Sequence, residues 1–286
     1  MTRDLAITFA GGGNRAFYQL GLMNRWRERL WPRLAALATC SAGACVATLL
    51  LSGRENEAGD FWKERREGVT RNFELRKLLS GKRPTPHEPI YRATLLHAFA
   101  EGGLERIRAQ PFPVFILTTA FPRRMPALAA VMLGLCAYNV EKSFRKEMIH
   151  PTLGRRAGFK AAVFDARDCE TAEQLTDLII ASSATPPFTS LGSFAGLRLL
   201  DGGIIDNVPA FLVDEVPEVK KNLVLLTRPY PLRVTGRHGT RLYIAPAEAL
   251  PVNRWDYTRP HLIDATIEAG ERDAARYEPL LSDFLN

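Results

Sequence analysis

Two apolar runs near the start of the chain, each followed at once by a tight turn of small residues, constrain the fold more than any other feature. The first run, Leu5 to Ala10, is rich in strand-forming residues and leads into Gly11-Gly12-Gly13. Residues 15–30 then place apolar side chains at helical spacing. The second run, 34–39, leads through Cys40-Ser41-Ala42-Gly43 into another apolar helix pattern. The chain therefore begins with two consecutive strand–turn–helix units.

The same alternation of strands and helices continues along the chain. Further strands are predicted at 112–121, 161–165, 197–201 and 222–227. Helices are predicted at 90–108, 171–182 and 258–281, with a charged amphipathic segment at 60–79 and Asp206 as a turn residue or N-cap ahead of 208–215. This order favours a three-layer α/β/α domain with a mostly parallel central sheet. No linker or repeat interrupts residues 1–286, so we predict a single domain.

The composition narrows the classes of partner. Hydrophobic residues make up 46% and charged residues 24% of the chain, which excludes a disordered, collagen-like or coiled-coil protein. The net charge of +7 favours nucleic acid, an anionic lipid surface or a phosphate-bearing substrate as partner. The basic residues are interspersed with acidic ones and form no stripe interleaved with aromatic residues, which argues against nucleic acid.

The cysteines and the N-terminal sequence bear on the compartment. The four cysteines show neither CxxC spacing nor a histidine at metal-ligand spacing, so we expect free thiols and no metal site. The first apolar run is too short for a signal peptide, and no segment reaches the roughly 20 apolar residues that cross a bilayer. We therefore expect a cytoplasmic protein.

Ser41 is the first candidate for chemistry. It stands in Thr39-Cys40-Ser41-Ala42-Gly43, between a predicted strand and a predicted helix. In that context a G-x-S-x-G turn forces the serine into a strained conformation that exposes its hydroxyl, and the small neighbours let strand and helix approach closely. The helix N-terminus also stabilises negative charge that develops there. The pattern predicts a nucleophile.

Gly11-Gly12-Gly13-Asn14-Arg15 follows the first strand and opens the first helix. Three glycines let backbone N–H groups converge on an anion, either a phosphate or an oxyanion. The segment is not a dinucleotide motif, because Ala16 stands where G-x-G-x-x-G requires glycine, and it lacks the G-K-[ST] ending of a P-loop. The interpretation that uses both the glycine turn and the serine turn is an oxyanion hole beside Ser41.

Asp201 is the third candidate. It ends a predicted strand and precedes Gly202-Gly203, which places its carboxylate at the C-terminal edge of the sheet, where a serine turn also points. A carboxylate within hydrogen-bond reach of a serine hydroxyl acts as general base and later as general acid.

In this order the three elements resemble the patatin-like phospholipase family and, more distantly, cytosolic phospholipase A2. The matching segments are GGGNR at 11–15, TCSAG at 39–43 and DGG at 201–203, with SSATPPF at 182–188 and Asn207 and Pro209 in support. The resemblance implies a phospholipase A-type lipid acyl hydrolase with a Ser41–Asp201 dyad, a phospholipid or other lipid ester as substrate, and no cofactor. It places the oxyanion hole at Gly11, Gly12, Gly13 and Arg15, and Arg15 would also hold the lipid phosphate or the loop.

The chain departs from the family pattern in two places. Thr39 replaces the first glycine of G-x-S-x-G, and a β-branched residue there is expected to crowd the turn. The second departure is an inserted segment at about 122–159, which contains an apolar block, Met125 to Tyr138. Basic residues flank that block: Arg123, Arg124, Lys142, Arg145, Lys146, Arg155 and Arg156. Residues 123–146 are either an interfacial segment that contacts anionic membrane peripherally or an ordinary buried helix hairpin.

Two other functions fit parts of the pattern. His238 and His261 follow Asp201 in the order Ser…Asp…His, which is typical of an α/β-hydrolase triad esterase. A non-catalytic module could use the glycine turn and the positive charge to bind lipid or phosphate. Loss of activity in Asp201→Asn but not in the histidine variants identifies a dyad, and a fluorophosphonate probe separates an enzyme from a binder.

Overall fold

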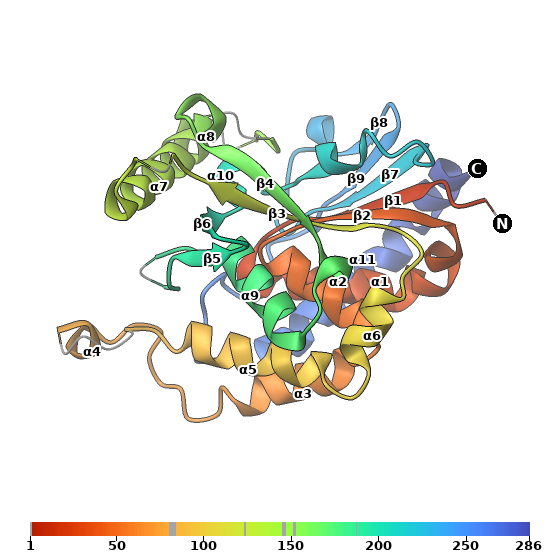
Figure 1. Cartoon of the computed structure of the whole chain (residues 1–286). Helices are drawn as coiled ribbons and strands as arrows, with labels where there is room; N and C mark the ends of the chain where they lie inside the picture. The colour runs from red at the N-terminus through yellow and green to blue at the C-terminus, as the bar shows by residue number, and fades with distance from the viewer. Residues whose placement is uncertain (1, 80–83, 123, 145–146, 151–152, 187) are drawn as a thin grey trace.

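The computed structural model describes the chain except residues 1, 80–83, 123, 145–146, 151–152 and 187, and it describes no side chains at 135 and 137–144. Within this part, nine strands form one sheet in the order β5-β6-β3-β2-β1-β7-β9-β8, with β4 also paired to β3 (Figure 1). The strands are β1 (Leu5–Phe9), β2 (Leu34–Cys40), β3 (Val114–Ala120), β4 (Lys160–Asp165), β5 (Gly192–Phe194), β6 (Leu197–Asp201), β7 (Lys221–Leu225), β8 (Gly236–His238) and β9 (Arg241–Ile244).

Helices cover both faces of the sheet (Figure 1). One face carries a thick layer of helices: α1 (Phe17–Leu30), α2 (Ala42–Ser52), α3 (Glu55–Glu64), α5 (His87–Phe99), α6 (Gly103–Arg108), α9 (Ala172–Ser182) and α11 (Leu262–Leu285). The other face carries α7 (Ala127–Phe144), α8 (Leu153–Arg156), α10 (Gly203–Asp206) and the 3-10 turn η4 (Ala210–Val213). The remaining short elements are α4 (Leu75–Leu79), η1 (Gly13–Ala16), η2 (Trp31–Arg33), η3 (Ala166–Asp168) and η5 (Leu232–Val234).

The size of the strand side chains decides which layer covers which face. Along β1, Leu5, Ile7 and Phe9 lie in the main hydrophobic core, on the side of the long helices. Ala6 alternates with them and packs in a separate small cluster that includes Val213 of η4. Bulky side chains therefore meet the thick helical layer, and small ones allow a short 3-10 turn to approach the sheet closely.

The predicted fold class is confirmed, because the five central strands β3, β2, β1, β7 and β9 are parallel. The strands outside them, β4, β5, β6 and β8, pair antiparallel. Two predicted helices, 90–108 and 208–215, differ from the structure. The helix at 90–108 divides into α5 and α6, because Glu101 and Gly102 adopt left-handed φ values of 51° and 83°. The segment 60–79 likewise divides, into α3 and α4, and 208–215 contains η4 instead of an α-helix.

Strands β2 and β6 meet end to end beside β3. β2 runs parallel to β3 and ends at Cys40, which pairs with Leu117. β6 runs antiparallel to β3 and ends at Asp201, which pairs with the next residue, Thr118. Ser41 and Asp201 therefore lie where the two strands meet. The sequence predicted Asp201 at the C-terminal edge of the sheet, and it reaches this place on a strand that runs antiparallel to β3.

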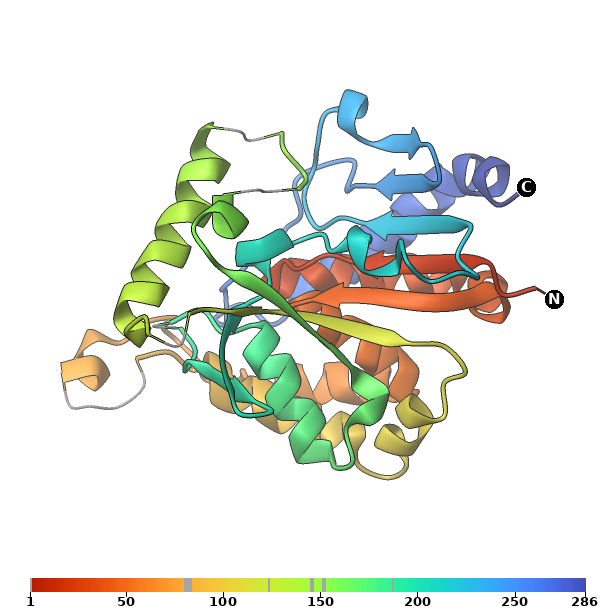
Figure 2. The same ribbon diagram turned by 45° about the horizontal axis from the view of Figure 1, so that its top comes forward.

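Within the described residues, the inserted segment contains the helix α7 and the short helix α8, and α7 is exposed on one side. Both views show α7 at the end of the sheet away from the two termini (Figures 1 and 2). Its inner side packs on α10, where Gly134 lies so close to Ile204 that an added Cβ would be 2.8 Å from the Ile204 side chain. On its outer side Leu128 is 75% and Met132 62% exposed. Among the described residues, no helix has the length and apolar character needed to cross a membrane.

Candidate active site

Ser41 occupies a strained turn between β2 and α2. Its φ of 53° and ψ of −130° lie outside the regions that residues with a side chain ordinarily occupy. The backbone N–H of Ser41 donates to Ser182 Oγ at 2.8 Å, and the Ser182 hydroxyl donates to the Leu117 carbonyl at 2.6 Å. Ser182 thus ties the turn to β3 and holds it in the strained conformation.

Gly43, rather than position 39, is the crowded position of this turn. A Cβ at Gly43 would lie 2.3 Å from the Phe9 carbonyl oxygen, so only glycine lets α2 start against the end of β1. Thr39, where the family pattern has glycine, is fully buried in β2, and its hydroxyl donates to the Phe115 carbonyl of β3 at 2.8 Å. The Thr39 hydroxyl is thus bound to β3.

Asp201 lies within hydrogen-bond distance of the serine. Ser41 Oγ donates to Asp201 Oδ2 at 2.9 Å. The second carboxylate oxygen, Oδ1, accepts the backbone N–H of Gly203 at 2.7 Å, and Thr185 Oγ1 approaches Oδ2 at 3.3 Å. Ser41 itself is 8% exposed. The carboxylate is therefore held on two sides while one of its oxygens faces the hydroxyl.

The pKa of Asp201 is raised above its usual value of 3.8. Burial raises the pKa, and this outweighs the hydrogen bonds from Gly203 and Ser41 and the positive charge of Arg254, which all lower it. A carboxylate with a raised pKa is a stronger base than an exposed one, so its environment favours proton transfer from a neighbouring hydroxyl.

The first residue of the glycine turn is held by Asn207 and Thr227 from two other segments. The Gly11 N–H donates to the Asn207 carbonyl at 2.9 Å. The Gly11 carbonyl accepts from Asn207 Nδ2 at 2.8 Å and from Thr227 Oγ1 at 2.7 Å. Within the described residues, no acceptor takes the N–H of Gly12 or Gly13. Of the three predicted glycine donors, Gly11 is thus already engaged, whereas the other two border the cavity at Ser41.

The loop that contains residues 253–259 braces the glycine turn from the other side. The Asn14 N–H donates to the Arg254 carbonyl at 3.0 Å, and Asn14 Nδ2 donates to the Asp256 carbonyl at 2.7 Å. Gly13 has a φ of 58°, and a Cβ there would lie 2.3 Å from the Arg254 carbonyl oxygen. Close packing on this loop therefore requires glycine at position 13.

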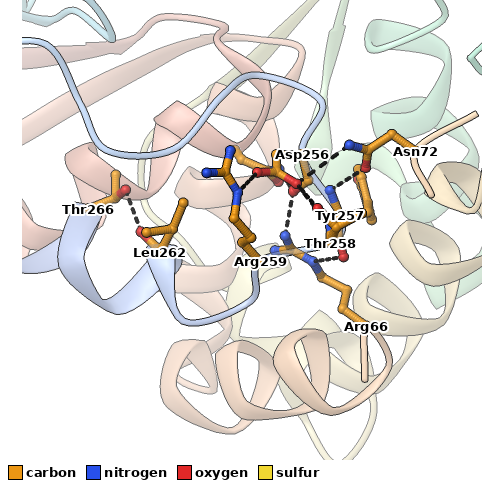
Figure 3. Close-up of polar contacts among 9 residues, drawn as sticks. Arg66, Asn72, Asp256, Tyr257, Thr258, Arg259, Leu262 and Thr266 are labelled. Carbon is orange, nitrogen blue, oxygen red and sulfur yellow. Dashed lines mark hydrogen bonds and ion pairs between the residues drawn. The ribbon is translucent and has the colours of Figure 1, made fainter. Parts of the chain in front are cut away.

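Asp256 organises that loop (Figure 3). Its buried carboxylate accepts from the backbone N–H and hydroxyl of Thr258 at 2.9 and 2.7 Å and from Arg259 Nε at 2.6 Å. Burial raises the pKa of Asp256, but the hydrogen bonds from Thr258, Arg259 and Asn72 outweigh it and lower the pKa to about 2. The guanidinium of Arg66, which is 1% exposed, donates to the Asp256 and Tyr257 carbonyls.

Comparison with known proteins identifies the family of this chain. The family model of the patatin-like phospholipases matches residues 7–214, which include the glycine turn, Ser41 and Asp201. The chain belongs to the patatin-like phospholipase family. Members of this family are lipid acyl hydrolases, so the prediction of the family and of lipid hydrolysis as its general activity is confirmed.

A solved structure supports the fold of this patatin-like chain. It is similar to VipD from Legionella pneumophila, with a TM-score of 0.50 at 12% sequence identity, over 99% of this chain and 67% of that one. At this identity the likeness shows the fold alone. Comparison with curated proteins gave no match.

Two cavities adjoin Ser41 in the patatin-like chain. An open one of about 200 Å³ is lined by Asp201, Thr185 and Arg254 among others. A narrower, largely apolar one of about 40 Å³ extends among the helices of the thick layer. Gly13, Ser41 and Trp255 line both, so the serine stands at their boundary. Arg15, predicted to help hold a lipid phosphate, lines neither of them, and the cation at the open cavity is Arg254.

The two histidines of the alternative triad lie away from the serine. His238 is exposed in β8 at the far edge of the sheet, where its Nε2 contacts the Thr235 carbonyl at 3.1 Å. His261 is exposed at the start of α11. Neither lines a cavity with Ser41.

Several residues around the serine were missed in the sequence. Asn207 and Thr185 lie in segments that resemble the family pattern, so the sequence could have assigned them to the site of Ser41. Arg254, Trp255 and Asp256 follow the matched part of the chain and show no motif, and only the fold brings them to the glycine turn.

Proposed function

We propose that this chain is a phospholipase A-type hydrolase of lipid esters whose catalytic dyad is Ser41 and Asp201. The hydrogen bond of 2.9 Å from Ser41 Oγ to Asp201 Oδ2, at a strained strand–helix turn, is the observation that carries the proposal. A hydroxyl is a weak nucleophile until a neighbouring base takes its proton, and Asp201, with its raised pKa, is such a base.

The reaction proceeds in two steps. Ser41 Oγ attacks the ester carbonyl as its proton passes to Asp201, and the N–H groups of Gly12 and Gly13 stabilise the resulting oxyanion. Asp201 then gives the proton to the leaving alcohol, and an acyl ester on Ser41 remains. Water loses a proton to Asp201 as it attacks that ester, which releases the fatty acid and restores the serine hydroxyl.

The two cavities receive the two parts of the substrate. The general acid has to stand on the side of the leaving oxygen, and Asp201 lines the open cavity but not the narrow one. The leaving alcohol with its head group therefore occupies the open cavity, beside Arg254, and the acyl chain enters the narrow apolar one.

The dyad is tested by labelling and turnover. Wild type is expected to react with a fluorophosphonate probe and to release fatty acid from phospholipid, whereas Ser41→Ala loses both and Asp201→Asn loses at least about 10³-fold in rate. Ser193→Ala, at an exposed serine in β5, is the control and keeps both activities. If Ser41→Ala retained turnover, or if His238→Ala or His261→Ala lost as much as Asp201→Asn, the dyad would be wrong.

We also propose that the outer side of α7 contacts an anionic membrane. Leu128, Met132 and Leu133 are exposed there, and Val131 of the same helix lines the open cavity. Exposed Arg124, in the same insertion, supplies positive charge next to these side chains in sequence. Of the other predicted basic residues, Arg155 and Arg156 are exposed too, while Arg123, Arg145, Lys146 and the Lys142 side chain lie outside the described residues.

Vesicle binding tests this surface. Leu128→Asp combined with Met132→Asp is expected to weaken binding to anionic vesicles at least about tenfold, because two inserted apolar side chains are replaced by charge. The ratio of hydrolysis on vesicles to hydrolysis of a monomeric ester should fall with it. Leu232→Asp, at a residue that is 87% exposed in another part of the molecule, is the matched control. Unchanged binding in the α7 variant would contradict the proposal.

The segment after the family match supports a single domain. β7 pairs with β1, β9 pairs with β7, and α11 packs on α1. We therefore propose that residues 1–286 act as one unit, with the insertion at 122–159 joined between β3 and β4.

A further inference from the structure

Two residues in the wall of the narrow cavity beside Ser41 carry buried polar groups, although most of the cavity wall is apolar. The cavity lies among α1, α2, α3 and α5, and most of its wall is aliphatic or aromatic. Two of its wall residues, Trp62 and His87, carry buried nitrogens, Nε1 and Nε2 respectively, with no hydrogen-bond partner in the described part of the chain. Trp62 is 5% and His87 7% exposed, so bulk water does not compensate for the missing bonds.

Each unpaired nitrogen has a defined hydrogen-bonding capacity. The indole N–H of Trp62 is a donor only. The other ring nitrogen of His87, Nδ1, contacts the Tyr257 hydroxyl, and burial lowers the pKa of His87 to about 3. The imidazole is therefore neutral, and its Nε2 is a donor or an acceptor depending on the tautomer that the Tyr257 hydroxyl selects.

An unpaired buried polar group destabilises a folded protein unless a ligand or water satisfies it. Two residues in the wall of one cavity that begins at Ser41 carry such groups, and together they point to a ligand with a polar atom within its apolar part. A cationic group does not fit, because the buried guanidinium of Arg66 lies over the Trp62 and Tyr257 rings, 5.8 and 5.0 Å from their centroids. A neutral oxygen fits: it accepts from the indole, and a hydroxyl also pairs with His87 in either tautomer.

We propose that the narrow cavity selects acyl chains that carry a hydroxyl group, with Trp62 and His87 as the residues that recognise it. This inference rests on the proposed function, since it takes the acyl chain to enter the narrow cavity from Ser41. The recognition is noncovalent, and ester hydrolysis leaves the hydroxyl unchanged. A purely apolar cavity would discriminate in the opposite direction, because burial of an unpaired hydroxyl is unfavourable.

Matched esters test the proposal. We expect kcat/KM for p-nitrophenyl esters of a fatty acid to rise at least about tenfold when a hydroxyl is placed at the favoured carbon, located by moving it along the chain. In Trp62→Phe, which removes the N–H and keeps an aromatic ring, the ratio of hydroxylated to plain ester should fall several-fold. In His87→Phe it should fall to about one or below. The ratio is measured within one preparation, so a reduced folded fraction does not affect it.

Trp26→Phe is the matched control. Trp26 is also a buried tryptophan, but its Nε1 donates to Glu278 at 3.0 Å and it does not line the narrow cavity. The wild-type ratio should persist in this variant. The proposal is overturned if no hydroxyl position gives an advantage, or if all three variants change the ratio alike.

Binding of the free acids keeps the test independent of turnover. Titration calorimetry of Ser41→Ala with hydroxy and plain fatty acid is expected to show tighter binding of the hydroxy acid by a similar factor, and equal or weaker binding overturns the proposal. Failure of the proposed function gives a different result: wild type then hydrolyses neither ester and escapes the fluorophosphonate probe.

Discussion

Two opposing effects act on the pKa of the Asp201 carboxyl group. Burial raises its pKa, while Gly203, Ser41 and the charge of Arg254 lower it. In the proposed mechanism the carboxylate has to be ionised to accept the serine proton, so kcat/KM should decline as pH falls through the raised pKa of Asp201. This acidic decline measures the balance of the two influences.

Arg254→Gln tests that balance. Removal of the positive charge destabilises the ionised carboxylate, so the pKa of Asp201 rises further and the acidic decline of kcat/KM moves to higher pH. Arg272→Gln, at a residue that is 70% exposed, should leave the profile where it is. A profile that moves to lower pH, or not at all, contradicts a role for Arg254 near the carboxylate.

At the scale of single residues, the sequence identified those residues that stand in a recognisable strand–turn–helix motif. Ser41, Asp201 and the glycines each follow a strand and precede a helix, and that context is visible in the sequence. Trp62, His87 and Arg254 were missed because they come from separate segments whose local sequence is that of ordinary helix or loop. Their relation to Ser41 exists only after the helices pack.

Among the elements, the junction of β1, β2 and α2 tolerates the least change. Gly43→Ala should lower the free energy of unfolding by about 1–3 kcal/mol, because the new methyl group meets the Phe9 carbonyl at 2.3 Å. Displacement of α2 would also move Ser41 and reduce turnover. Gly59→Ala in α3 is the control: its Cβ meets nothing within 4 Å, and alanine favours the helix. Urea unfolding of both variants checks the difference.

The order of strands and helices could be predicted from the sequence more completely than the direction of each strand. Continuous runs of apolar residues predicted the central strands, because these strands are buried on both faces. Strand direction depends on connections, and the sequence carried no sign that β4 and β6 both pair antiparallel with β3. The break between α5 and α6 was missed because Glu101 is one of the few non-glycine residues with a left-handed φ.

At the scale of the whole molecule, the loop around Asp256 binds the C-terminal part of the chain to the N-terminal glycine turn. Asp256→Asn should lower the free energy of unfolding by about 1–2 kcal/mol at neutral pH, because a neutral amide replaces the carboxylate that accepts from Arg259 and Thr258. The folded-state pKa of about 2 is lower than the ordinary 3.8, so this stabilisation is present above pH 3.8 and disappears as pH falls toward 2.

Urea unfolding at pH 7, 5 and 3 checks this dependence. The difference between wild type and Asp256→Asn should be constant at the two higher values and smaller at pH 3. Asp214→Asn, at a carboxylate that is 52% exposed and pairs with Arg241, should differ from wild type by less than about 0.5 kcal/mol. A difference at Asp256 that grows with acidity would contradict the assignment.

The meeting of β2 and β6 beside β3 separates the part of the molecule that can vary from the part that positions Ser41 and Asp201. Leu117 and Thr118 are neighbouring residues of one strand, so the spacing between serine and aspartate is fixed by a single peptide unit. The insertion leaves the same strand beyond Ala120 and returns as β4 on its opposite edge. The α7 segment can therefore lengthen, shorten or be replaced, and with it the proposed lipid-contacting surface, while β3 keeps the spacing of Ser41 and Asp201.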